Sequence, residues 1–362
     1  MPELDNSLNN YLSYTKRKVY FGILLIILIV IFSVFAISLG PLHIPIKEVL
    51  NAISLKNILN FILNGCENVN TLVVVNIRLP RVITAVIAGA GLAVSGAVIQ
   101  NVLRNPLGSP FTLGISQGAA FGAAFAIIVL GAGEIHSSST DAVFAHNLYL
   151  TSTIAFLGAL LGIFIILFLT KWRGLSPEAV ILAGIAIGAL FNAATTFIEF
   201  FATDTEVASV VFWLFGDIGR AGWSEAGIMF VVTTFGFIYF ILNRWNYNAL
   251  ESGDETAKGL GVNTDKIRIY GMIVSSLIVA IAVAFLGVIG FIGLVAPHIT
   301  RRIIGNDQRF LIPISALFGS LLLLISDTLA RIMISPIIIP VGIITSFIGG
   351  PLFLYILARR RM

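Results

Sequence analysis

Charged side chains are scarce in this sequence. Only 11% of its 362 residues are Asp, Glu, Lys or Arg, whereas 57% are hydrophobic, and the mean hydropathy is +0.99. Because soluble domains carry about 25% charged residues, the deficit excludes a water-soluble fold of this length. The apolar runs are unbroken and do not alternate with polar residues, so they predict membrane-spanning helices and not the strands of a barrel.

Several kinds of catalytic and coupling chemistry are also missing. No Asp, Glu, Lys, Arg or His lies at the centre of a predicted span. This disfavours a proton-driven carrier, because such carriers place ionisable relays inside the membrane, although sodium coupling through backbone carbonyls stays open. The sequence has no GxxxxGK[ST] motif to hold ATP phosphates and no HExxH zinc motif. We therefore expect no enzymatic activity, no cofactor and no metal site.

Cysteine occurs once, as Cys66, so no disulfide can form within the chain and the redox compartment cannot be read. The formal net charge is +4. An excess of Lys and Arg is typical of the cytosolic loops of membrane proteins, so we expect no nucleic-acid partner. Lys16–Lys18 precede the apolar run Val19–Leu39, which is longer than the about 7–15 residues of a signal-peptide core. We interpret it as an uncleaved first span after a cytosolic tail, residues 1–18.

The region Ile269–Thr300 decides the topology. As a single helix it would be about 48 Å long, against a hydrocarbon core of about 30 Å, and glycines interrupt its middle. If it crosses twice, by one full helix and one short or broken one, most of the 22 basic residues lie in the cytosol; a single crossing divides them evenly. The positive-inside rule therefore predicts about ten spans with both termini cytosolic. Besides the first, these are Val82–Leu103, Leu113–Leu130, Leu148–Leu169, Val180–Phe201, Ala226–Leu242, the two passes, Phe310–Ile325 and Val341–Leu357.

The loops between these spans are unequal. Outside, Gly40–Val75 can hold an amphipathic surface helix, Ala132–Asn147 is polar and expected to be mobile, and Ala202–Ser224 contains a short interfacial helix anchored by Trp213. Inside, residues 243–268 form the longest loop. Its segment Glu255–Lys258 can form a helical turn that glycines end, which is either a docking handle or a plain surface turn.

Small residues line several spans. The stretch Arg78–Ala119 is rich in Gly, Ala and Ser and nearly uncharged between its flanking arginines and Arg104. Gly158 and Gly162, like Gly184 and Gly188, have the GxxxG spacing. Such residues let helix backbones approach closely in a membrane bundle, so these helices are expected to be packed inside the protein.

Five stretches together resemble the FecCD/BtuC family, the permease subunits of ABC importers for iron chelates, haem and cobalamin. In chain order they are RLPR…GAGLAVSGAVIQNVLRNPLGSPFTLGISQGA, GDETAKGLGV, AFLGVIGFIGLVAPHITRRIIG, LLLLISDTLARI and IPVGIITSFIGGPLFLYIL. The resemblance implies one transmembrane permease domain over residues 1–362, with the all-α, ten-helix bundle of a BtuC-like (type II) ABC importer in the plasma membrane. It also implies a homodimer with a path along its interface, two cytosolic ATPase subunits, an extracytoplasmic substrate-binding protein, and lipid around the spans.

The resemblance also assigns roles to residues. Arg78, Arg81 and Arg331 would be solvated outside and would pair with carboxylates of the binding protein. The cytosolic turn Arg104, Asn105 and Pro106 would lie near the ATPase. Ser176, Pro177 and Glu178 form the candidate gate, although the proline and the glutamate depart from the small hydroxylated residues expected there. The residues expected to couple to the ATPase are Gly253, Asp254, Glu255, Thr256, Ala257, Lys258, Gly259, Leu260 and Gly261.

The substrate is the least determined part of the prediction. In the resembled family, selectivity resides largely in the binding protein, so an iron(III)–siderophore is expected by family frequency alone. Cobalamin, haem and molybdate-type oxyanions stay open. An ion-coupled secondary carrier and a membrane-embedded enzyme are the competing functions. The charge-free span centres and the docking loop disfavour the former, and the lack of a catalytic constellation disfavours the latter.

Overall fold

The structure, a computed structural model, describes residues 2–40, 44–54, 69–132, 148–174 and 176–358. The predictions made for Cys66 and for the loop at 133–147 fall outside these ranges. Within them the chain is helical, and its one extended pairing is an isolated bridge between Ile334 and Ile337. The expected all-α membrane architecture is thus confirmed.

Seven helices in the described ranges are long and apolar enough to cross a membrane. The shorter apolar segments are α6 with the π-helical turn after it, and α16; α14 supplies one more pass, so about ten crossings result. The long helices are α1 (Pro2–Ser38), α5 (Leu79–Val102), α7 (Leu148–Arg173), α8 (Pro177–Glu199), α10 (Trp223–Leu242), α13 (Thr264–Leu286) and α15 (Gln308–Ile332), and the short ones are α6 (Ile115–Ala124), α14 (Ile292–Ile304) and α16 (Val341–Ala358).

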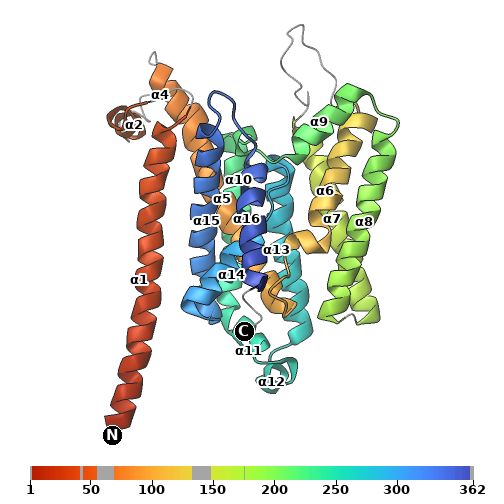
Figure 1. Ribbon diagram of the computed structural model, residues 1–362. Helices are drawn as coiled ribbons and strands as arrows, with labels where there is room; N and C mark the ends of the chain where they lie inside the picture. Colours follow the sequence, from red (N-terminus) through yellow and green to blue (C-terminus); the bar gives the residue numbers. More distant parts are fainter. Residues whose placement is uncertain (1, 41–43, 55–68, 133–147, 175, 359–362) are drawn as a thin grey trace.

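Helix α5 is the centre of the bundle. In the most apolar window of its continuous helix Val69–Val102, 83% of the residues are buried, against 22% for α1 and 28% for α8. It packs on α13, α14, α15 and α10, while α6, α7 and α8 form a second group at the other side, and α1 stands at the opposite edge beside α15 (Figure 1). The small-residue helix predicted around Arg78–Ala119 is therefore the buried one.

Glycines account for these close approaches. A Cβ atom on Gly89 would lie 2.4 Å from the carbonyl oxygen of Gly319 in α15, and one on Gly96 would lie 1.7 Å from that of Gly293 in α14. One glycine of each GxxxG pair behaves in the same way. Gly158 of α7 meets the backbone of α6, and Gly184 of α8 meets the backbone just before Gly114. The predicted helix-packing role of these glycines is confirmed.

The region Ile269–Thr300 crosses twice, as the charge distribution predicted. Helix α13 ends at Leu286, residues 287–291 are not helical, and α14 begins at Ile292. This unwound segment, Gly287–Phe291, starts beside Gly342 at the beginning of α16, and its last residue packs against Gly349 in the middle of α16. The segment therefore descends from one end of the bundle to its middle, where α14 takes over. Non-helical backbone at this depth requires cover by protein or water.

Helix α1 begins at Pro2, so the described part of the predicted cytosolic tail is helical. Two further helices are also longer than the sequence predicted. The helix containing α5 begins at Val69 with α4 (Val69–Val73) and continues through the π-helical turn Val74–Arg78. The wider turn accommodates Pro80, which lacks an N–H and would crowd the carbonyl four residues before it in a regular helix. Helix α15 runs to Ile332, past the predicted end at Ile325. Both extensions carry charged residues, and in a membrane protein a charged residue predicts a loop outside the span.

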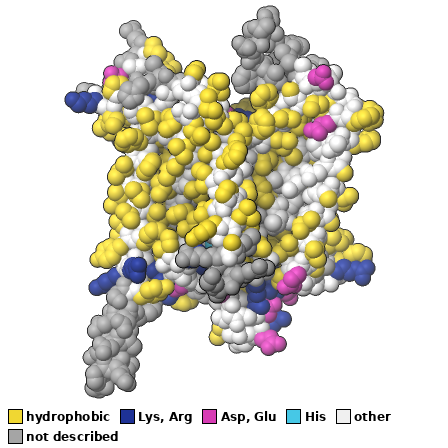
Figure 2. Space-filling model, viewed as in Figure 1, with side chains coloured by type: hydrophobic (Ala, Val, Ile, Leu, Met, Phe, Trp, Pro, Cys, Tyr) yellow, Lys and Arg dark blue, Asp and Glu magenta, His cyan; other side chains and the backbone are white. Residues whose placement is uncertain are grey.

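The two ends of the molecule differ. Both ends of the chain, α11 (Arg244–Glu251) and α12 (Asp254–Gly259) lie at one end, which is cytosolic under the positive-inside rule (Figure 1). At the opposite, outer end lie α2 (Ile46–Ile53) and α9 (Asp204–Leu214), which are the two predicted surface helices. Hydrophobic side chains cover the middle of the visible face, while Lys, Arg, Asp and Glu gather toward the ends (Figure 2).

Candidate functional site

A cluster of ion-paired side chains lies at the outer end of the helix bundle. Asp327 of α15 is completely buried and binds two arginines. Arg81 of α5 donates from Nε at 2.9 Å and lies 2.8 Å away through Nη2, and Arg331, one turn further along α15, donates from Nε at 3.1 Å. Arg81 also reaches Asp217, in the loop after α9, at 3.1 Å. The cluster therefore joins α5, α15 and an outer loop through charge-assisted hydrogen bonds.

Two of the arginines also hold the end of α1. Arg78 Nη1 donates to the carbonyl oxygens of Ile37 and Ser38 at 2.6 and 2.9 Å. Arg331 Nη1 donates to those of Ala36 and Leu39, both at 2.9 Å. The last carbonyls of a helix have no partner within it, so the guanidinium groups satisfy them. These two arginines thereby attach the end of α1 to the bundle, although the rest of α1 is poorly buried.

These contacts correct the picture of solvated arginines. The three predicted docking residues do meet at the outer end, but Arg78, Arg81 and Arg331 are only 5%, 8% and 4% exposed. Their side chains point inward because Asp327 and the end of α1 offer better partners than water does. Asp217 and Asp327 were not identified from the sequence as partners of these arginines. The spacing of Asp327 and Arg331, four residues apart on a helix, was the signal available for the second of them.

At the cytosolic end, α11 and α12 form a compact unit, here called the coupling unit (residues 244–261). The predicted helical turn is present as α12, and Gly261 follows with a φ of +82°, in the left-handed region that glycine favours. Ala257 anchors α12 because it is fully buried, whereas Lys258 and Leu260 are exposed, the leucine by 69%. The unit thus projects beyond the bundle with charged and apolar side chains at its tip (Figure 2).

Asp254 attaches α12 to two different parts of the bundle. Its carboxylate is 2.7 Å from Arg268 Nη2 in the first turns of α13 and 2.5 Å from Arg104 Nη2 in the turn after α5. Arg268 Nε also donates to the carbonyl of Val102, and Arg104 donates to that of Leu250 from two nitrogens. The predicted cytosolic turn and the predicted coupling residues are therefore in direct contact.

Helix α11 is bound to the core by amide side chains. Asn101 of α5 donates to the carbonyl of Tyr247 at 3.2 Å and to Glu251 at 2.8 Å. Asn248 bonds to Asp307, which caps the start of α15, at 3.0 Å. Burial alone would raise the pKa of Asp307, but hydrogen bonds from Arg309 and Asn248 outweigh it and lower this pKa to about 2. The coupling unit is thus attached to α5, α13 and α15.

The candidate gate has a local explanation. Ser176 is the N-cap of α8 and accepts a hydrogen bond from the backbone N–H of Ala179, Pro177 occupies the first turn, and Glu178 lies at the positive end of the helix dipole. Serine, proline and an acidic residue in this order begin a helix. Their departure from small hydroxylated residues therefore reflects capping, and their role as a gate stays a prediction.

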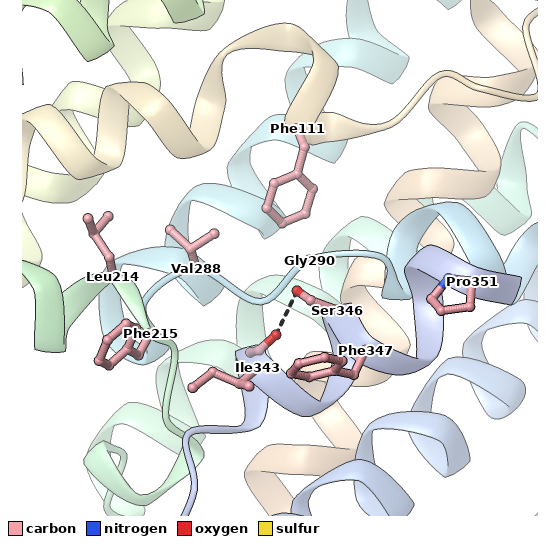
Figure 3. A pocket seen from close by; sticks show the side chains of 10 residues that line it. Phe111, Leu214, Phe215, Val288, Gly290, Ile343, Ser346, Phe347 and Pro351 are labelled. Atoms are coloured by element: carbon pink, nitrogen blue, oxygen red, sulfur yellow. Dashed lines mark hydrogen bonds between the residues drawn. The ribbon is translucent and has the colours of Figure 1, made fainter. Parts of the chain in front are cut away.

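A cavity of about 510 Å³ lies against the unwound segment. Phe111 approaches it from one side, and Ile343, Ser346 and Phe347 of α16 from the other (Figure 3). The Ser346 hydroxyl donates to the carbonyl of Gly342 at 2.8 Å and is thereby satisfied within its own helix. The remaining lining residues are Leu214, Phe215, Val288, Gly290, Gly342 and Pro351, so no side chain in the wall carries a charge.

Comparison with known proteins identifies the assembly to which these features belong. A model of the FecCD transport family matches residues 25–359. The chain belongs to the FecCD transport family. It is 53% identical to a chain named as an ABC transporter permease protein of Methanocaldococcus jannaschii, with 96% of this chain and 97% of the relative covered. It is 37% identical to the hemin transport system permease protein HmuU of Yersinia pestis, over 79% and 83%.

A solved structure extends the likeness to three dimensions. A chain described as a metal-chelate-type ABC transporter in an inward-facing conformation matches this FecCD protein with a TM-score of 0.78 and 29% identity, over 93% of this chain and 98% of that one. The protein is therefore the permease component of an ABC importer, a multi-pass protein of the plasma membrane. ATP hydrolysis belongs to a separate ATPase subunit, in agreement with the missing phosphate-binding motif.

Proposed function

We propose that this permease moves a metal chelate inward by alternating access, with energy from ATPase subunits that bind the coupling unit. The observation that carries the proposal is the coupling unit itself. It projects from the cytosolic end, its tip is exposed, and its base is attached to three helices that cross the membrane. Such an attachment can convert a push at α12 into a displacement of the bundle, which is what alternating access requires.

The proposed assembly is a homodimer with two ATPase subunits inside and one substrate-binding protein outside. Helix α8 supports the pairing, since Leu182, Leu190 and Phe197 on it are each about two-thirds exposed, at 67%, 70% and 67%. The cavity next to the unwound segment supports a path beside α16, because non-helical backbone in a membrane must face protein or water. We place the path between the two copies.

The chemistry of the cavity favours one substrate class. Its wall is aromatic and aliphatic, and its one hydroxyl already has a partner. A small oxyanion such as molybdate would find no cationic side chain there, whereas the organic surface of an iron(III)–siderophore matches such a wall. Cobalamin and haem have similar surfaces and are the alternatives, supported by the relative that transports hemin.

The outer arginine cluster acts in this proposal as a support for docking. Arg78 and Arg331 fix the end of α1 and Arg81 fixes the loop at Asp217, so these buried residues shape the surface that the binding protein meets. Their replacement would weaken docking by deforming that surface. Docking that is unchanged in the Arg78→Glu, Arg331→Glu variant would count against this assignment.

The test of the coupling unit uses Leu260, the exposed apolar residue at its tip. The permease is expressed with its ATPase, and the amount of ATPase that copurifies is measured, followed by ATP-dependent uptake of a ⁵⁵Fe-loaded hydroxamate siderophore into proteoliposomes that also receive the binding protein. Leu260→Asp is expected to lower both copurification and uptake, and Lys266→Asp, an exposed residue of α13 outside the unit, to leave copurification intact. Uptake that continues without ATPase or ATP would refute the proposal.

A further inference from the structure

We propose that Arg104 is the residue through which movement of α12 reaches α8. The inference rests on the proposed function, since it requires that ATPase subunits push on α12. It adds a specific route and a positioning residue that the family assignment does not contain. Three features of the structure, each in a different part of the route, support it.

The first feature is the connection between α12 and the turn after α5. Arg104 Nη2 lies 2.5 Å from Asp254 at the start of α12, and Arg104 also donates twice to the carbonyl of Leu250, at 3.2 and 3.0 Å, in α11. One guanidinium group therefore holds both helices of the coupling unit. A planar group with donors fixed in a fork resists reorientation better than a single ammonium does, so a displacement of α12 carries Arg104 along.

The second feature is the backbone at Arg104. Its φ is +46°, in the left-handed region where glycine is favoured over residues with a side chain. At the end of a helix this is the usual place for glycine. Glycine would fit this backbone conformation better, so the presence of arginine indicates that its side-chain contacts are needed at this position. The contacts to Asp254 and Leu250 supply that reason, and they lie at a place where strained backbone often accompanies function.

The third feature is the chain that leads from Arg104 to α8, which begins with a hydrogen-bonded turn. The turn is internally rigid, because Asn105 accepts from the N–H of Leu107 at 2.9 Å and its carbonyl accepts from Gly108 at 2.9 Å. It leads directly to the 3₁₀ turn Pro110–Leu113, which is closed by a reciprocal cap between Ser109 and Thr112.

That 3₁₀ turn lies directly on α8. A Cβ atom on Gly184 would be 2.1 Å from the carbonyl oxygen of Thr112, so the two backbones touch with no side chain between them. Gly114, just after the turn, also faces Gly184 and Gly188. A backbone contact of this kind transmits displacement, because close-packed interiors are scarcely compressible.

The same carboxylate has a second attachment, which leads first to α13 and the end of α5. Arg268 joins Asp254 to α13 at 2.7 Å and to the end of α5 through the carbonyl of Val102 at 3.1 Å. Loss of Arg104 therefore leaves α12 attached to the central helices. Asp254 thus divides the motion into two branches. The branch through Arg104 reaches α8 directly by the turn after α5, whereas the branch through Arg268 reaches it less directly, through α13 and the helices α6 and α7 that pack on both.

The experiment measures the two branches separately in the permease–ATPase complex in nanodiscs. In a Cys66→Ser background, one environment-sensitive maleimide label is placed at Ile185→Cys on α8 or at Lys266→Cys on α13, both exposed positions. The signal is the change in emission when ATP and vanadate are added. No transported substrate is needed.

The decisive variant is Arg104→Gly, which removes the side chain while giving the left-handed backbone the residue that suits it, so folding is not impaired at this turn. We expect the α8 response to fall at least about fivefold, the lower end of couplings between distant sites, while the α13 response and ATP hydrolysis persist. Arg104→Lys, which keeps the charge, should restore part of the α8 response. An α8 response in Arg104→Gly equal to that of the parent would overturn the route. If neither label responds in the parent complex, the proposed coupling function fails as well.

Discussion

Replacement of Asp327 by asparagine is the sharpest test of how the outer end is held together. The substitution keeps the shape of the side chain and removes its charge, so it creates no cavity. Asp327 is completely buried and binds Arg81 and Arg331 at 2.8 to 3.1 Å. After the change, Arg81 keeps Asp217, whose side chain is 33% exposed, as its charged partner, and Arg331 keeps its bonds to backbone carbonyls.

The expected loss follows from the cost of leaving a buried charge without its partner. Removing one partner of a buried ion pair destabilises proteins by about 3–5 kcal/mol. Because Asp217 still compensates Arg81, and the asparagine oxygen can accept one hydrogen bond, we expect the lower end, about 3 kcal/mol. The double variant with Arg81→Gln should lose less than the sum of the two single changes, by about 1 kcal/mol or more, since residues in one network do not act additively.

The assay is equilibrium unfolding in mixed micelles of dodecylmaltoside and SDS, followed by tryptophan fluorescence and circular dichroism. Glu199→Gln provides the matched control, because Glu199 also lies near the outer end but has no basic side chain within 4 Å among the described residues. Its unfolding should change by no more than about 0.5 kcal/mol, as is usual outside such networks. If Asp327→Asn unfolds like that control, the cluster does not stabilise the outer end and the reasoning is wrong.

Three further outcomes are expected. Because the folded-state pKa of Asp307 is lowered from 3.8 to about 2, its contribution to stability is complete above the unfolded pKa and is lost as the pH falls toward 2; the difference in unfolding between wild type and Asp307→Asn should shrink over that window. Gly96→Ala should lower stability by about 1–3 kcal/mol or more, because its Cβ would meet the carbonyl of Gly293. Gly227→Ala, in α10 with open space around it, should be neutral or stabilising by up to about 1 kcal/mol, given the higher helix propensity of alanine. Equal effects at the two glycines would contradict the glycine-contact argument.

The sequence predicted the fold well where one principle dominated. Long apolar runs require helices, and the distribution of basic residues selected the double crossing that α13 and α14 make. Prediction failed where two distant residues compensate each other. In the sequence, Arg81 and Asp327 each predict a position outside the membrane. They lie 246 positions apart in the chain, and only the ion pair that they form allows both charges to be buried within helices. The same applies to Arg104 and Asp254, whose sequence positions give no sign of contact.

The unwound segment Gly287–Phe291 has a consequence for how the protein is made. Until α16 packs against it, this segment would present non-helical backbone halfway across the bilayer, where unsatisfied N–H and C=O groups are costly. The neighbouring cavity of about 510 Å³ is lined on one side by α16, so docking of α16 is what covers this backbone. Membrane insertion of α13 and α14 is thus favoured together with that of α16, and a chain whose α16 has not docked should be the form that the cell's quality control recognises and removes.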